Sequence, residues 1–195
     1  MTESRLFGGL GGSIAACMNM RFPCLMTLSL LLALPAAAET KKTVAPAHPA
    51  AAAAAGPKSI GKFEDWTAAT HSESGQTVCY AFTRAQSSAP VLPGRGAVVL
   101  TVTERSSGRD AVAIEAGFSY AANAAVTVQV DQAGLEFYTS GRNAFARDGK
   151  AAAVAFGKGS RAIARSPGPK EVTDTFSLKG FGAAYAAIVK ACPAK

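Results

Sequence analysis

Several residue types on which enzymes depend are scarce in this sequence. Its 195 residues include two histidines, one tryptophan and four cysteines. His48 lies in a stretch rich in alanine and proline, so His71 is the only imidazole in the part expected to fold. A Ser-His-Asp hydrolase needs such a histidine beside its nucleophile, and no Gly-x-Ser-x-Gly motif accompanies it. We interpret His71, which polar residues surround, as a surface residue in a loop between two strands.

Residues that other reactions require are also missing. A structural zinc site needs about four ligands at paired spacings, which one histidine and distant cysteines do not supply. Residues 157–160 (Gly-Lys-Gly-Ser) resemble the end of a phosphate-binding P-loop, but the glycine that begins this motif is absent. Glu64 and Asp65 are adjacent and would point to opposite sides of a strand, which is unsuitable for a general acid and base. The sequence therefore predicts no catalytic residue, metal or cofactor.

No apolar run is long enough to be a membrane-spanning helix. The longest apolar run is typical of an export sequence. Arg21 precedes the apolar run Leu25–Leu34, and residues 36–38 (Ala-Ala-Ala) provide an A-x-A cleavage site. A membrane anchor is the alternative, but this run is too short to span about 30 Å of hydrocarbon. We predict that residues 1–38 are a signal peptide, with Met18 or Met20 as the possible true start.

The predicted export places the mature protein in the periplasm or outside the cell, without a transmembrane segment. Residues 14–17 (Ile-Ala-Ala-Cys) resemble a lipoprotein cleavage box, which leaves outer-membrane association open. Residues 39–58 contain three prolines around six consecutive alanines. A helix of that length does not persist in water, so we predict a disordered linker before a single β-rich domain over residues 59–195.

Removal of residues 1–38 would leave two cysteines, Cys79 and Cys192. In an exported protein such a pair favours a disulfide, although two buried free thiols are the alternative. The bridge would join the second predicted strand to the C-terminal helix.

Apolar residues alternate with polar ones through most of the domain, which is the pattern of β-strands. Trp66 opens the first predicted strand, and turns rich in glycine and proline separate the others, which lie near residues 78–82, 98–103, 112–115, 126–131, 135–138, 161–165 and 172–176. Hydrophobic residues make up 49% of the chain, but many of them are alanine. We predict a mainly β protein, an antiparallel β-sandwich or meander of about eight short strands.

Two helices interrupt the strands. Asp148 is a plausible N-cap for a short helix over residues 149–156, with Gly157 as its end. The second predicted helix begins after Ser177, its expected cap, and carries Phe181, Tyr185, Ile188 and Cys192 on one face. We expect it to pack on the sheet, with Trp66, Phe63, Phe181 and Tyr185 as core anchors.

The charge is unevenly distributed. The full chain has a formal charge of +7, and the mature chain would keep +6. Residues 141–170 account for this excess, with Asp148 as their only acidic residue. The predicted anion- or partner-binding residues are Arg142, Arg147, Lys150, Lys158, Arg161, Arg165 and Lys170.

This basic segment is either a solvated face or a docking surface. The partner of a docking surface would be an anionic envelope component, such as a lipid head group or lipopolysaccharide, or an acidic protein. We do not expect nucleic acid as a partner, since export removes it and no aromatic residues are interleaved with the charges.

Two short motifs resemble one protein family. Phe63-x-Asp65-Trp66-Thr67 after an export linker, Cys79 in the next strand, and residues 176–181 (Phe-Ser-Leu-Lys-Gly-Phe) before an alanine-rich helix are similar to the invasion-associated locus B family. The resemblance implies an exported, envelope-associated β-rich domain of alpha-proteobacteria, in some pathogens linked to host-cell entry, without established catalytic residues. An envelope enzyme or enzyme inhibitor without a recognisable motif is the alternative to a binding protein.

The sequence departs from this family in its cysteines. Members often carry a cysteine shortly after the tryptophan and a further pair mid-chain, but residues 68–70 are Ala-Ala-Thr and residues 118–138 contain no cysteine. The pairing of Cys79 with Cys192 is therefore predicted for this chain alone.

Overall fold

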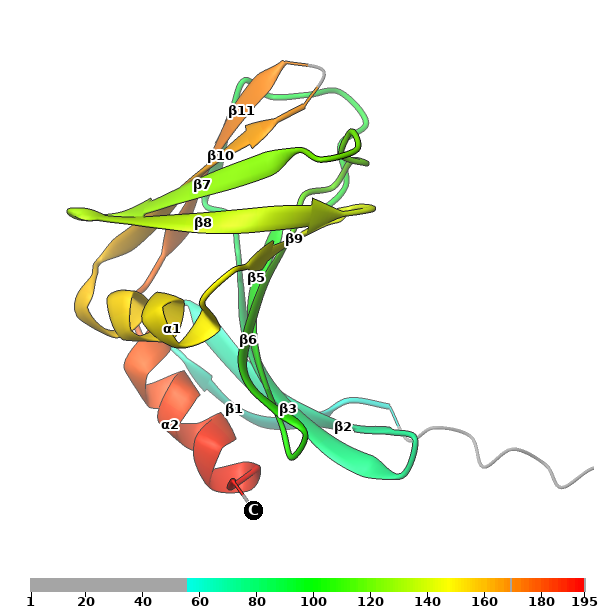
Figure 1. Cartoon of the computed structure of the whole chain (residues 1–195). Coiled ribbons are helices and arrows are strands. Elements are labelled where there is room, and N and C mark those ends of the chain that lie inside the picture. The colour runs from blue at the N-terminus through cyan, green and yellow to red at the C-terminus, as the bar shows by residue number, and fades with distance from the viewer. Residues whose placement is uncertain (1–55, 169, 195) are drawn as a thin grey trace, which may run out of the picture. The chain divides into compact units, whose positions relative to one another are not determined.

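The computed structural model describes residues 56–168 and 170–194, which form eleven strands and two helices (Figure 1). The predicted signal peptide and most of the predicted linker lie outside the described residues. The elements are β1 (Lys58–Phe63), β2 (Trp66–Glu73), β3 (Gln76–Arg84), β4 (Ser87–Ala89), β5 (Val99–Arg105), β6 (Gly108–Glu115), β7 (Ala125–Val130), β8 (Ala133–Ser140), β9 (Asn143–Ala146), α1 (Gly149–Lys158), β10 (Arg161–Pro167), β11 (Glu171–Ser177) and α2 (Phe181–Ala191).

The predicted class, mainly β and antiparallel with two helices, is confirmed. All eleven strands belong to one sheet, in the order β1-β2-β3-β5-β6-β9-β8-β7-β10-β11-β4. The number of strands exceeds the predicted eight because β1, β4 and β9 lack an extended alternation of apolar residues. Lys58, assigned to the end of the linker, is the first residue of β1.

The sheet bends strongly around one core. The chain leaves β3 at Arg84 and changes partners at once, since Ala85 N–H donates to the Val98 carbonyl and Gln86 N–H to the Thr175 carbonyl. It then enters β4, which pairs with β11 at the far end of the strand order. Figure 1 shows this curvature, with β7 and β8 running across the direction of β5 and β6.

Both helices lie on the inner side of the bend (Figure 1). Phe156 of α1 and Phe181 of α2 pack edge to face with ring centroids 5.6 Å apart. They join side chains from the inner face of the sheet, and the largest fully buried aromatic residues are Trp66, Phe137, Phe156, Phe176 and Phe181. Burial of these aromatic rings supplies much of the hydrophobic stabilisation.

The helix boundaries differ in detail from the prediction. Asp148 caps α1 as expected, since its carboxylate accepts from Ala151 N–H at 2.9 Å. The helix passes Gly157 and ends at Lys158, and the N–H of its C-cap residue, Gly159, donates to the Ala155 carbonyl. Ser177 does not cap α2, because its hydroxyl accepts from Lys179 N–H and the N-cap is Gly180. Neither helix in the described part of the chain is long and apolar enough to cross a membrane.

Candidate functional site

The two motifs that resemble a known family contact each other in the core. Trp66, at the start of β2, is fully buried and donates its indole N–H to the Ser177 carbonyl at 3.0 Å. Its ring packs edge to face on Phe181, with centroids 4.9 Å apart. A buried indole N–H needs such an acceptor, so this bond fixes the end of β11 against the start of β2.

Gly180 allows this close approach. Its φ is +84°, and a Cβ at this position would lie 2.1 Å from the Phe63 carbonyl oxygen. Only glycine adopts this conformation readily and leaves space for the backbone of β1. Phe63 and Tyr185 are half-buried and pack against the edge of the core, whereas Trp66 and Phe181 lie inside it.

The predicted disulfide between Cys79 and Cys192 is present, across 113 residues of sequence. Cys79 lies on the inner face of β3, and Cys192 is the C-cap residue of α2. The bridge therefore attaches the end of α2 to the sheet, while the Trp66 contacts hold its beginning.

A buried polar cluster adjoins the disulfide. Glu104 of β5 pairs in register with Cys79 and is fully buried. Its Oε2 lies 2.6 Å from Arg109 Nε, but the two are not aligned for a hydrogen bond, and Oε2 has no other hydrogen-bond partner. Arg109 also donates to the Cys192 carbonyl, and Tyr185 of α2 donates to the Asp110 carboxylate. The cluster thus joins β5, β6 and the end of α2.

Burial determines the protonation of this cluster. Removal from water raises the pKa of Glu104 to about 7, although the Arg109 charge opposes the shift. Burial, reinforced by Asp110, raises the pKa of the Tyr185 hydroxyl above its ordinary value, which keeps it a neutral donor. These groups hold the helix in place, and the Cys192 end of the cluster borders a hollow of about 390 Å³.

A second buried ion pair is fully satisfied. The Arg95 guanidinium binds both oxygens of Asp174 at 2.8 and 2.7 Å, and its Nε donates to the Ala116 carbonyl. Ser88 donates a further bond to Asp174. The planar guanidinium also lies over the Phe118 ring, 5.0 Å from its centroid. A bidentate pair with this geometry fixes the loop between β4 and β5 on β11.

Neither cluster was predicted, although both carboxylates follow the strand pattern of the sequence. Glu104 continues the inward series of Leu100 and Val102 on β5, and Asp174 lies between Val172 and Phe176 on β11. Alternation with a period of two therefore places each carboxylate on the core side. Buried carboxylates require charged or hydrogen-bonding partners. This requirement identifies both positions as candidates for buried polar clusters.

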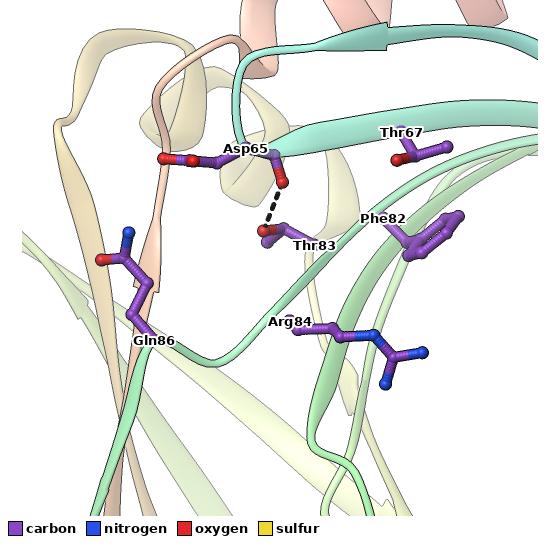
Figure 2. A pocket seen from close by; sticks show the side chains of 6 residues that line it. All are labelled: Asp65, Thr67, Phe82, Thr83, Arg84 and Gln86. Carbon is purple, nitrogen blue, oxygen red and sulfur yellow. Dashed lines mark hydrogen bonds between the residues drawn. The ribbon is translucent and has the colours of Figure 1, made fainter.

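Asp65 and His71, the polar candidates nearest the tryptophan, do not meet. Asp65 lines a small hollow of about 220 Å³, where the Thr83 hydroxyl donates to its carbonyl at 2.8 Å. Figure 2 shows the Asp65 carboxylate and the Arg84 guanidinium directed to different sides of this hollow. His71 lines a separate hollow and lies within β2, so its assignment to a loop was wrong. The strand continues past it because Thr70–Glu73 pairs fully with β3.

The seven predicted anion-binding side chains are all exposed but lie on several elements. Arg161 and Arg165 point outward from the same side of β10, and Lys150 and Lys158 lie at opposite ends of α1. Arg147 lies between β9 and α1, Arg142 in the β8–β9 turn beside Gly96, and Lys170 in the β10–β11 turn.

The sheet brings three of these cations into one neighbourhood. Arg165 pairs with Thr127 of β7, which pairs with Glu136 of β8. Arg147 lies 3.7 Å from the Glu136 carboxylate. Arg161 is four residues from Arg165 on the same strand, or about 13 Å. Arg161, Arg165 and Arg147, here called the β10 basic group, lie on the outer face, with Glu136 between two of them.

Within residues 56–168 and 170–194, no group of three or more potential metal ligands is placed to hold an ion.

Comparison with known proteins identifies one family by its sequence model. The model of the invasion associated locus B (IalB) protein family matches residues 66–189. A crystal structure of invasion associated protein B from Bartonella henselae is similar, with 18% sequence identity and a TM-score of 0.49, over 67% of this chain and 95% of that one. The comparison with curated proteins gave no match. Because the family match spans the tryptophan strand through the C-terminal helix, the chain belongs to the invasion associated locus B family.

Proposed function

We propose that this chain is an exported, non-enzymatic binding protein of the bacterial envelope, and that the β10 basic group binds a phosphate-bearing envelope component. The main support for the proposal is that the buried charged groups pair with each other, whereas the exposed arginines of β10 do not take part in these buried pairs. The carboxylates buried in the core, Glu104 and Asp174, are engaged by Arg109 and Arg95, whereas the β10 cations face solvent.

Arginine suits this role because its planar guanidinium binds phosphate oxygens through two parallel hydrogen bonds. Arg147 and Glu136 form a loose, solvent-exposed pair, and such pairs contribute little. Arg147 can therefore exchange its carboxylate for a phosphate at low cost. Basic residues near an anionic membrane surface contribute about 1 kcal/mol each.

The test is binding to vesicles that contain an anionic phospholipid. Arg161→Gln with Arg165→Gln should weaken binding by about 2 kcal/mol, which is roughly 30-fold. The matched control is Lys58→Gln with Lys62→Gln, which removes the same charge from exposed positions on β1 and should have a smaller effect. Equal losses for the two pairs would show that net charge alone acts, and would contradict a localised site.

A further inference from the structure

The outer face of β2, β3 and β5, opposite α2, carries a row of half-buried aromatic rings. His71 and Tyr80 pack edge to face with centroids 5.4 Å apart, and Tyr80 and Phe82 stack at 6.0 Å. The register places Tyr80 beside Thr103 and Phe82 beside Thr101 on β5. Threonine hydroxyls therefore flank Tyr80 and Phe82 on the β5 side.

This row borders a hollow with a volume of about 560 Å³. Small-molecule sites have volumes of about 300–1,000 Å³. The lining residues are Gly56, Pro57, His71, Ser72, Tyr80, Thr101, Thr103 and Arg105. Val78, on the same outer face, is only 2% exposed, so neighbouring side chains already cover this part of the face.

The hollow has little net charge. Its only charged lining side chain, Arg105, is paired with the Glu73 carboxylate, with Nη2 and Oε2 3.1 Å apart. The charge of Arg105 is therefore neutralised, and the adjacent Glu73 carboxylate would repel an anion in this hollow. A purely apolar ligand would remove hydroxyls from water without replacing their hydrogen bonds, which is unfavourable.

The remaining chemistry combines flat apolar ring surfaces with hydroxyls that both donate and accept hydrogen bonds. A pyranose ring presents the complementary combination, with C–H groups on its faces and hydroxyls around its rim. We propose that this hollow binds a neutral saccharide, with Tyr80 as the stacking residue and Thr101 and Thr103 as hydrogen-bonding residues. The surface differs from the β10 basic group and takes a different class of ligand.

The test is titration of the purified full chain with uncharged oligosaccharides built from hexoses or N-acetylhexosamines, followed by calorimetry or by protein NMR shifts. Tyr80→Ala should weaken binding about tenfold, which corresponds to about 1.4 kcal/mol. The matched control, Tyr138→Ala, removes an exposed aromatic ring from β8 and should change affinity less than about twofold. Raising the salt concentration should leave the affinity unchanged, which distinguishes this site from the β10 basic group.

Two results would overturn the proposal. The first is an absence of binding to every neutral oligosaccharide tried, and the second is equal loss with Tyr80→Ala and Tyr138→Ala.

Discussion

Two buried carboxylates differ in how completely their neighbours satisfy them. Asp174 accepts two hydrogen bonds from a guanidinium and one from a serine hydroxyl. Removal of one partner from such a buried pair strongly destabilises the folded protein. Glu104 has one oxygen without a hydrogen bond, close to a misaligned arginine. Glu104 is therefore the residue at which folding and protonation are coupled.

Substitution of Glu104 should change how stability depends on pH. The pKa of Glu104 is about 7 in the folded protein, against an ordinary value of 4.5, so the folded state binds more protons between these values. Stability should therefore fall as pH rises from about 4.5 to 7, by at most about 1.4 kcal/mol per pH unit from this group. Urea denaturation at pH 5, 6 and 8 should show a smaller slope for Glu104→Gln.

The control for this measurement is Glu136→Gln, which alters an exposed carboxylate on β8 and should keep the slope of the unmodified protein. Parallel slopes for Glu104→Gln and the unmodified protein would contradict a raised pKa at Glu104.

Helix α2 is the element on which the fold depends most. The Trp66 contacts hold its start, the disulfide and the Arg109 bond hold its end, and Tyr185 binds Asp110 in between. Its N-cap, Gly180, and Gly182 in its first turn differ in their surroundings. Gly180 has a positive φ and abuts β1, whereas Gly182 has open space around it.

Alanine at these two glycines should act in opposite directions. Gly180→Ala should destabilise the protein by about 1–3 kcal/mol, because the added methyl group meets the Phe63 carbonyl and the backbone is strained. Gly182→Ala should stabilise it by about 0.5–1 kcal/mol through helix propensity. Thermal and urea unfolding of both variants measure this; a neutral Gly180→Ala would contradict the close approach of β1.

Loss of the disulfide should loosen the same helix from its C-terminal end. Cys79→Ala with Cys192→Ala should lower the free energy of unfolding by about 2–5 kcal/mol. Peptide mass spectrometry of the unreduced protein should recover the Cys79 and Cys192 peptides as one linked species. Recovery of both peptides as free thiols from protein purified without reductant would contradict the bridge.

The alternation of apolar and polar residues predicts the strands that carry it, and it does not predict strands that form only because a neighbouring strand lies beside them. Val126, Val128 and Val130 alternate regularly, and the strand they indicate is β7. The three residues of β4 have no such pattern, and this strand exists because β11 lies beside it. The inward position of Glu104 follows from alternation, but its neighbour Tyr185 comes from a helix eighty residues away. Contacts that depend on docking of α2 are not visible in local periodicity.

At the scale of the whole molecule, the fold redistributes the charge seen along the sequence. Residues 141–170 are strongly basic, yet β8 and β11 bring Glu136 and Glu171 beside the cations of β10. The outer face is therefore a mixed surface, on which exposed arginines outnumber carboxylates only locally. The proposed anionic ligand would therefore contact Arg161 and Arg165 rather than the whole segment.

The most direct test of this proposal is the salt dependence of vesicle binding by the unmodified protein. Binding to vesicles with anionic phospholipid should weaken progressively between about 50 and 500 mM salt, because screening shortens the range of exposed charges. Vesicles of neutral lipid alone should bind weakly at every salt concentration. Equal binding to both vesicle types, or binding to anionic vesicles that salt leaves unchanged, would contradict an anion-binding role for the β10 basic group.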